Sequence, residues 1–376
     1  MKNLRMIFTA ETAKRAEVFL LFFLCGLGVL CGKAFCGELR FKFSPGDKYS
    51  LVLVTEQKSA QVVDGNEQTS EQTTRLECDF DIEEVDESGC AWVKYTHKRV
   101  TMKVRSPKQK IDYDSDANQL KTPMQVLPLR LAMGEGIYLR ITPQGRIEKI
   151  NGLQALITSA KAKMASFAGA DKVGQSIAET FAEPTIKREL EDRLRIFPGP
   201  NEQGTTWSQT NILSPAEAGF GGPEWTGEVN IIYEKTFRLK SSTTSPAPAS
   251  SDANLGGGQS GVAVVDVNLV IKTASAPVAG APAPGTPMRN DLEVSGGGTG
   301  QIEIEEATGR IINSKITEDM TARLVYAAQG PMLRPPPPTE PITTHTVTTF
   351  QMTQREPPVP DKVEVDKLAR PADANR

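Results

Sequence analysis

The stretch Trp225-Thr-Gly-Glu-Val-Asn-Ile-Ile-Tyr-Glu-Lys-Thr-Phe-Arg-Leu239 decides the fold class of this chain. The apolar residues that share one face are Trp225, Val229, Ile231, Tyr233, Phe237 and Leu239, and the polar residues on the other face are Glu224, Thr226, Glu228, Asn230, Glu234 and Arg238. Successive side chains of a strand point to opposite sides of its sheet. Such alternation is typical of an antiparallel strand with one buried face.

The same alternation recurs on both sides of this stretch. It is interrupted by turn clusters such as Ser44-Pro-Gly-Asp47 and Asp86-Glu-Ser-Gly89. The other expected strands cover residues 39–43, 49–53, 76–82, 91–95, 137–141, 147–150, from 206 onward, 262–271, 302–304, 311–326 and a Thr-rich segment at 342–354. The polar segment 106–123 is expected to be a loop or an excursion at the sheet edge.

The middle of the chain changes to a helical period. Between about 151 and 197, apolar residues recur every three or four positions, which predicts amphipathic helices. Three helices are expected, the first ended by Gly169 and the third opened by Pro184 in its first turn. Glu189 and Arg193 are spaced to form an i,i+4 ion pair on the third helix.

The order of these elements predicts an α+β fold that is mainly antiparallel β. We expect a curved sheet or partial barrel, made from two β halves with the helical segment between them. A short internal echo supports two halves, because 141–150 and 304–313 both read strand, turn, Gly-Arg-Ile, strand. The alternative is that glycine before a strand is simply a common hairpin device.

Residues 1–36 have the pattern of a signal peptide for export. Basic residues precede an apolar run at 18–31, and small residues follow, which predicts cleavage after Cys36. The run is shorter than the ~20 residues that span a bilayer as a helix, although an uncleaved membrane anchor is the alternative. A lipid-modified cysteine is not favoured, because each leader cysteine follows a large residue, namely Leu24, Leu30 or Phe35. The expected localisation is the periplasm or cell envelope.

We expect the rest of the chain to comprise a β-rich domain at 37–334 and a tail at 335–376. The tail would hold a Pro-rich spacer, the Thr-rich strand and a disordered end. Two segments at 241–260 and 274–290 are rich in Ser, Ala, Pro and Gly, and such composition predicts flexible insertions.

Charge and cysteine usage narrow the possible partners. The formal net charge is −3, with both signs interspersed, so the chain lacks the basic footprint of a nucleic-acid binder. Membrane contact is expected only through the N-terminal segment, if that segment is uncleaved.

Beyond the leader the cysteines are Cys78 and Cys90. An oxidising compartment permits their disulfide, whereas the expected hairpin register opposes a simple cross-strand bridge, so a bridge and two buried thiols both stay open.

Several turns and strand starts resemble a bacterial family without an assigned activity. They are Leu39–Tyr49, Ile111–Ser115, the hairpin Gly136–Leu153 with its Pro143-Gln-Gly145 turn, Gly204–Trp207 and Thr308–Arg310. The chain is similar to this family, domain of unknown function 6263, over roughly 38–330. The resemblance implies an exported protein and brings no catalytic residues, and the two insertions look like additions to the family's plan.

The search for catalytic, cofactor-binding and metal-binding residues assigns none. The only histidines are His97 and His345, and neither lies near a cysteine or paired acids in the sequence. The zinc-protease, Cys-x-x-Cys, phosphate-loop and Gly-x-Ser-x-Gly motifs are absent. A serine hydrolase would need one of the two histidines as its base.

Two further patterns receive structural interpretations. Asp112-Tyr-Asp114-Ser-Asp116 begins like a calcium loop, but Ala117 and Pro123 occupy the positions that require Gly and Glu. An EF-hand is therefore excluded, which leaves an irregular calcium site or a solvated loop. The glycine runs 256–258 and 296–298 lack the setting of a nucleotide-binding turn and are interpreted as linkers.

We therefore expect an exported, non-enzymatic binding or structural module of the cell envelope that needs no cofactor. Its partner would be an envelope protein or an apolar ligand. One alternative is a periplasmic carrier of an apolar or lipid ligand, with helices covering the concave face of a curved sheet. The other is a hydrolase with an unrecognised site.

Overall fold

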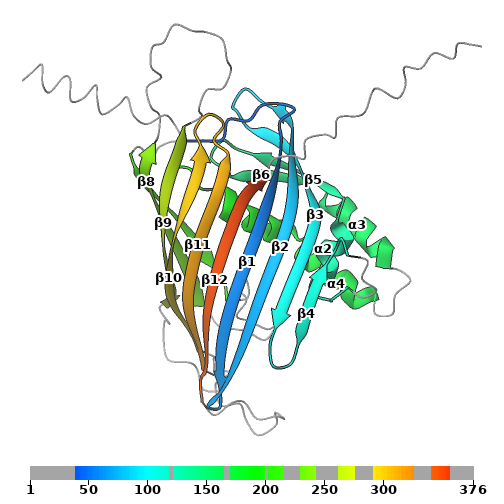
Figure 1. The fold of residues 1–376 in the computed structure, drawn as a ribbon, viewed down its shortest axis with the longest axis vertical. Coiled ribbons are helices and arrows are strands. Elements are labelled where there is room, and N and C mark those ends of the chain that lie inside the picture. The colour runs from blue at the N-terminus through cyan, green and yellow to red at the C-terminus, as the bar shows by residue number, and fades with distance from the viewer. Residues whose placement is uncertain are drawn as a thin grey trace, which may run out of the picture. The chain divides into compact units, whose positions relative to one another are not determined.

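One antiparallel sheet of 12 strands forms the body of the protein in the computed structural model (Figure 1). The structure describes residues 39–117, 122–164, 170–199, 202, 204–215, 229–242, 261–275, 291–325 and 340–355. The strands are β1 (Lys48–Val63), β2 (Asn66–Val85), β3 (Ala91–Arg105), β4 (Lys110–Asp114), β5 (Gly136–Ile141), β6 (Ile147–Asn151), β7 (Thr206–Leu213), β8 (Val229–Ser242), β9 (Val262–Ser275), β10 (Asp291–Glu305), β11 (Ile311–Val325) and β12 (Ile342–Arg355).

The strand order is β6-β5-β3-β2-β1-β12-β11-β10-β9-β8-β7, and β4 pairs with β3 beside this path. Within the described residues the two ends of the order do not pair, so the sheet is curved and open. The first half of the chain supplies β1–β6 and the second half supplies β7–β12, and the halves meet where β1 pairs with β12. The predicted α+β class, with two β halves and a curved sheet, is confirmed.

The Thr-rich strand lies inside the sheet. Its residues pair with β1 on one side and with β11 on the other. The expected boundary at residue 334 therefore separates a strand from its own sheet, and β12 belongs to the β-rich domain. Sequence pattern missed this placement because a Thr-rich strand carries little apolar signal to indicate a central position.

The helices lie on one side of the sheet, which we call its concave face. They are α2 (Leu127–Ala132), α3 (Leu153–Met164), α4 (Ala170–Thr180) and α5 (Glu183–Leu194). Three match the predicted helices, Pro184 lies in the first turn of α5, and the Glu189–Arg193 pair forms at 3.1 Å. The short helix α2 was not predicted. None of the described helices has the length and apolar character needed to cross a membrane.

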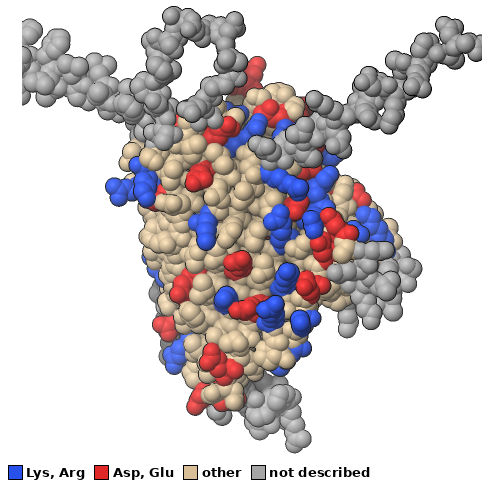
Figure 2. All heavy atoms as spheres, viewed as in Figure 1, with Lys and Arg blue, Asp and Glu red and all other residues tan. Residues whose placement is uncertain are grey.

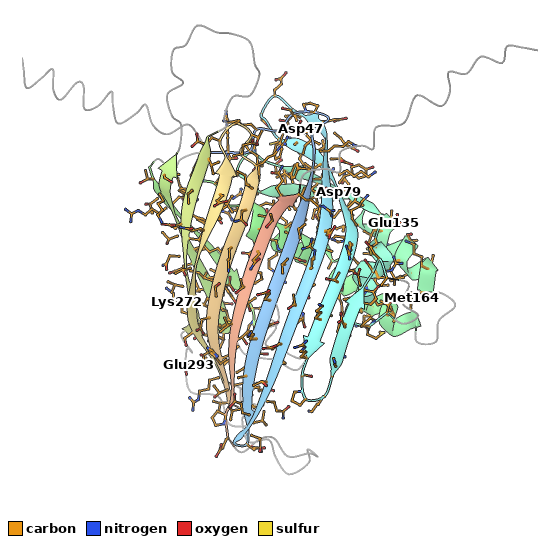
Figure 3. The ribbon with its side chains drawn as sticks, viewed as in Figure 1. Asp47, Asp79, Glu135, Met164, Lys272 and Glu293 are labelled. Atoms are coloured by element: carbon orange, nitrogen blue, oxygen red, sulfur yellow. The ribbon has the colours of Figure 1, made fainter. Side chains whose placement is uncertain are left out.

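Polar contacts fix the helical layer against the sheet. Glu135 lies in the loop before β5 (Figure 3). Its carboxylate accepts hydrogen bonds from Ser159 Oγ at 2.9 Å and Lys163 Nζ at 3.1 Å, both on α3. The Lys163 hydrogen bond, followed by that of Ser159, lowers the pKa of the Glu135 carboxyl. The convex face, opposite the helices, carries scattered charges of both signs (Figure 2), as the sequence predicts.

An extended segment at the start of the domain connects two hairpin turns from different halves. Phe41 N–H donates to Pro143 O in the β5–β6 turn, and Lys42 N–H donates to Thr308 O in the β10–β11 turn, both at 2.8 Å. These turns are the two echo motifs, and their glycines, Gly145 and Gly309, both have positive φ. Residues 39–43 were predicted as a strand, but they are not part of the sheet and instead hold the two turns together.

The glycines at 296–298 are also placed differently from the prediction. They lie within β10, paired with β9 and β11, so the linker interpretation is wrong for them. A methyl group on Gly298 would lie 2.5 Å from Thr317 O, and one on Gly296 or Gly300 would also collide with the β11 backbone. Glycine therefore permits β10 and β11 to approach closely on the concave face.

Some predicted segments have different bounds in the structure, and others lie outside the described residues. The excursion at 106–123 contains β4, and β8 and β9 extend into the ends of the predicted insertions. Cys78 and Cys90 are both buried free thiols. The leader 1–36, Trp225, Gly169, the glycine run 256–258, the remaining parts of the insertions, the spacer at 335–338 and the tail after 355 lie outside the described residues.

Gly298→Ala should destabilise the protein by about 1–3 kcal/mol, the usual cost of overpacking. The added methyl group would meet the β11 backbone, which cannot move aside as a flexible side chain can. Urea unfolding midpoints measure the effect. Gly174→Ala in α4 is the matched control, because its methyl group would lie 3.6 Å from the flexible Lys161 side chain. Equal midpoints for the two variants would contradict the close-approach explanation.

Candidate functional site

Helix α5 packs on the concave face of the sheet because its sequence provides one apolar stripe. Ile186, Leu190 and Leu194 recur at helical spacing and are buried. Just after the helix, Phe197 packs edge-on against Phe41 of the N-terminal segment, with ring centroids 4.8 Å apart. The polar residues of α5 therefore lie beside the sheet, next to two small cavities.

The first cavity lies between α5 and strands β1–β3 and has a volume of about 180 Å³. The sheet residues that line it are Leu53, Thr55, Thr74, Leu76, Tyr95 and His97, and the helical layer contributes Gln125, Pro128, Leu129, Thr180, Ile186, Glu189, Leu190 and Arg193. The lining thus combines apolar side chains with polar groups from both walls.

The second cavity lies on the other side of α5 and has a volume of about 50 Å³. Its apolar lining includes Leu53, Ile196, Phe237, Ile302, Ile316, Phe350 and Met352. Leu53, Thr55 and Arg193 line both cavities, so the two spaces adjoin beneath one helix. We call these two spaces together the α5 site.

Charged side chains converge on the second cavity from both walls. Lys235 of β8 is only 6% exposed and donates to Asp192 Oδ1 of α5 at 2.5 Å. Glu318 of β11 lines the same cavity. Burial raises the pKa of Glu318 to about 7, an effect that Asp192 adds to and the Lys235 ammonium opposes. Near neutral pH, this carboxyl therefore exchanges between its acid and its anion.

A chain of three buried polar side chains borders the first cavity. The Tyr95 hydroxyl lies 3.1 Å from Cys78 Sγ and 2.8 Å from His97 Nε2. Burial raises the pKa of the Cys78 thiol to about 12, and burial together with the nearby Arg193 lowers the pKa of His97 to about 4. The thiol is therefore protonated and the imidazole neutral at pH 7.

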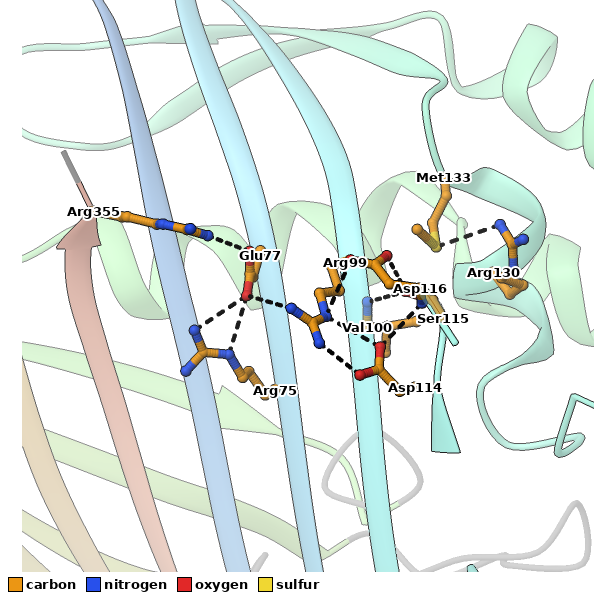
Figure 4. Close-up of polar contacts among 10 residues, drawn as sticks. All are labelled: Arg75, Glu77, Arg99, Val100, Asp114, Ser115, Asp116, Arg130, Met133 and Arg355. Atoms are coloured by element: carbon orange, nitrogen blue, oxygen red, sulfur yellow. Dashed lines mark hydrogen bonds and ion pairs between the residues drawn. The ribbon is translucent and has the colours of Figure 1, made fainter. Parts of the chain in front are cut away.

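The second histidine and the aspartate cluster lie elsewhere. His345 is on the convex face of β12, with Nε2 2.7 Å from Asp319 Oδ1, so the structure does not bring the two histidines together. Asp114 accepts two hydrogen bonds from Arg99, and Asp116 forms an ion pair with the same guanidinium (Figure 4). Among the described residues, no group of three or more His, Cys, Asp or Glu side chains is arranged to hold a metal ion.

A family model for an uncharacterised group of proteins matches residues 89–311, which is more than half of the chain. Its description is "Family of unknown function (DUF6263)". The chain belongs to this family. The predicted resemblance is therefore confirmed, and the matched region of this DUF6263 protein contains α5 together with β3 and β8. No curated protein matches the chain.

Several solved structures share a remote likeness with this DUF6263 protein. A structure reporting lipid–protein interactions in lipovitellin has 9% identity and a TM-score of 0.36, over 84% of this chain and 25% of that one. The chain thus spans about a quarter of the lipovitellin chain. The COG4313 outer membrane channel from Pseudomonas putida F1 has 7% identity and a TM-score of 0.20, over 86% of this chain and 100% of that one. At these TM-scores the likenesses say nothing about what the family binds.

The charged members of the α5 site were not singled out from the sequence. Lys235 is in phase with Ile231, Tyr233 and Phe237, so the alternation that predicts β8 also places this lysine on the buried face. Glu318 is likewise in phase with Ile316 and Met320. A charge at an inward position was the available signal, because such a charge must find a partner or change its ionisation.

Glu318→Gln should stabilise the protein selectively at high pH. The folded-state pKa of about 7 exceeds the ordinary value of 4.5, so the native state binds the proton more tightly than the unfolded state. The carboxyl consequently lowers stability as pH rises from about 4.5 to 7, by up to ~3 kcal/mol. Urea melts at pH 5 should give nearly equal stabilities, and melts at pH 8 should favour the variant.

Glu56→Gln on the convex face is the control for removing one negative charge. Its stability difference from the parent protein should not grow between pH 5 and pH 8. A Glu318→Gln effect that is the same at both pH values would contradict the raised pKa of the buried carboxyl.

Proposed function

We propose that this DUF6263 protein is a non-enzymatic binding protein of the cell envelope, and that it carries an amphipathic, mostly apolar ligand in the α5 site. The observation that supports this proposal is the pair of adjoining cavities beneath one helix. Both combine apolar side chains with polar groups, and charged side chains lie where the two spaces adjoin. Small-molecule sites generally combine such an apolar lining with a few placed polar groups.

The sizes of the cavities indicate how a ligand would enter. Volumes of about 180 and 50 Å³ are below the ~300–1,000 Å³ of typical ligand pockets. A ligand therefore requires α5 to shift away from the sheet and join the two spaces. The contacts that hold α5 include the Lys235–Asp192 pair, and its stripe of three buried apolar residues would be replaced by ligand contacts.

The protonation of the buried Cys78–Tyr95–His97 chain favours binding over nucleophilic catalysis. A cysteine nucleophile acts as the thiolate, whereas burial holds the Cys78 thiol in its protonated form. His97 already contacts Tyr95 through Nε2. We infer that these groups position the wall of the first cavity rather than attack a substrate.

The cell-envelope location is supported by the sequence of residues 1–36. Their basic leader, apolar run and small-residue exit have the pattern of an export signal. An apolar ligand in a water-filled compartment also needs a protein that shields it. The location and the binding function thus fit together in this proposal.

Thr55→Phe should strongly weaken binding of an apolar ligand, because Thr55 lines both cavities and a phenyl ring would occupy their junction. The uncharged fluorescent probe N-phenyl-1-naphthylamine reports binding by its increase in emission. We expect the purified parent protein to bind the probe and Thr55→Phe to bind it at least tenfold more weakly. Native mass spectrometry of protein purified from the envelope should also detect a bound lipid-sized mass.

The matched control is Thr353→Phe, the same replacement at an exposed position on the convex face of β12. This variant should bind the probe like the parent protein. If the parent protein shows neither probe binding nor a bound mass, the proposed carrier function is wrong. Equal probe binding by the two variants would place the ligand outside the α5 site.

A further inference from the structure

Next to the α5 site, the concave face of β12, β1 and β2 carries only uncharged polar side chains over three rows. Three cross-strand rows of β12, β1 and β2 follow one another: Thr348-Gln57-Gln72, Thr346-Ser59-Ser70 and Thr344-Gln61-Gln68. Every member can donate and accept hydrogen bonds, and none is charged or apolar. We call these nine residues the neutral array.

The neutral array continues directly from the α5 site. The next row towards α5 is Phe350-Thr55-Thr74, whose members line the cavities. A ligand that fills the α5 site with an apolar chain would therefore place its other end over the array. The side chains change along β1 from Leu53 through Thr55 to Gln57, from apolar to polar.

On the same strands, the residues that alternate with the array face the convex side, and several of them are charged. On the convex face Lys58 pairs with Glu71 at 3.3 Å, and Glu56 and Glu67 lie in neighbouring rows. A solvated sheet face normally carries such charges, and a core face carries apolar residues. The array matches neither pattern.

Most hydrogen-bonding capacity of the array is unused by the protein. Ser59 Oγ and Ser70 Oγ lie 2.8 Å apart, Gln61 Nε2 donates to Thr344 Oγ1 at 3.5 Å, and Gln72 Nε2 donates to Thr74 Oγ1 at 3.4 Å. Within the described part of the chain, the side chains of Gln57, Gln68 and Thr348 make no hydrogen bond to another residue. Gln57 and Thr348 are also half-buried, so they offer directed donors and acceptors on a partly enclosed surface.

We propose that the ligand of the α5 site carries an uncharged, hydroxyl-rich head group, such as a sugar or polyol, that hydrogen-bonds to the neutral array. This inference rests on the proposed carrier function and adds the class of the ligand. A charged head group would lose water without gaining a countercharge on the array, which is costly. Hydroxyl groups exchange their water hydrogen bonds for those of Gln, Ser and Thr at little net cost.

The charged groups near the array do not provide a site for an ionic head group. Glu318 pairs with Thr348 across β11 and β12, at the edge of the top row. Lys235 and Arg193 are matched by Asp192 and Glu189. Among the described residues beside the array, the cations are paired and leave no excess positive charge for an anion, and a cation would meet only the partly buried Glu318 carboxyl.

Three probes with the same ten-carbon chain separate the head-group classes. They are decyl maltoside, decanoate and decyltrimethylammonium, each titrated below its micelle concentration by isothermal calorimetry. We expect the maltoside to bind at least tenfold more tightly than either ionic probe. Ser59→Asp places a charge in the middle of the array. It should reduce maltoside affinity at least tenfold, because the carboxylate keeps its own water and prevents the sugar from contacting the array directly.

Ala60→Asp is the matched control, since residue 60 follows Ser59 on the same strand and faces the convex side. It should bind the maltoside like the parent protein. Should Ser59→Asp fail to fold, Gln57→Ala removes one amide without adding charge. It is expected to weaken maltoside binding about twofold to tenfold, the range of one hydrogen bond, and to leave N-phenyl-1-naphthylamine binding unchanged.

The outcomes distinguish this inference from the proposed function. If decanoate or decyltrimethylammonium binds as tightly as the maltoside, and Thr55→Phe removes that binding, the carrier function stands and the neutral head group is wrong. If the maltoside binds but neither Ser59→Asp nor Gln57→Ala weakens it, the head group does not lie on the array. If none of the three decyl probes binds although N-phenyl-1-naphthylamine does, the neutral head group is wrong. If that probe does not bind either and no bound mass is found, the carrier function itself is overturned.

Discussion

The burial of the apolar stripe of α5 against the concave face is the contact on which the rest of this structure depends. An open, curved sheet has an inner surface that no second sheet covers. Leu53, Leu76 and Phe237 would face water there if the helix were absent. Each such side chain contributes about 1.5–3 kcal/mol when fully buried. The helix thus covers the core face of the sheet, and the two cavities lie where the helix and the sheet do not pack fully against each other.

The position of α5 also explains why polar chemistry gathers in the interior. A helix laid across a sheet brings its flanking residues, here Asp192 and Arg193, against inward strand positions. Lys235 gains its partner in this way, and Cys78, Tyr95 and His97 form a neutral chain on the other flank. Lys235, Cys78, Tyr95 and His97 are buried and hydrogen-bonded, so their environment is sensitive to any displacement of the helix.

Much of this architecture follows from periodicity alone. Alternation along the chain and the helical period at 151–197 predict a curved sheet with three helices between its halves, and the structure confirms this where it describes the chain. The partners of β12 and the bridging role of residues 39–43 depend on contacts between distant parts of the chain, which local patterns do not encode. The α5 site was missed for a related reason. Its members come from β1, β8, β11 and α5, and only the out-of-character charges at Lys235 and Glu318 marked it in the sequence.

The central position of β12 has a consequence for how this protein reaches its native state. The first strand pairs along its length with the last, Ser50 with Arg355 and Val62 with Thr343. Pairings of such sequence separation form slowly, because the intervening chain must lose its freedom first. A growing chain that lacks its last strand leaves β1 and β11 as open edges and cannot join its two halves. The two halves can therefore be joined only after β12 has been synthesised, although the pairings within each half do not depend on that strand.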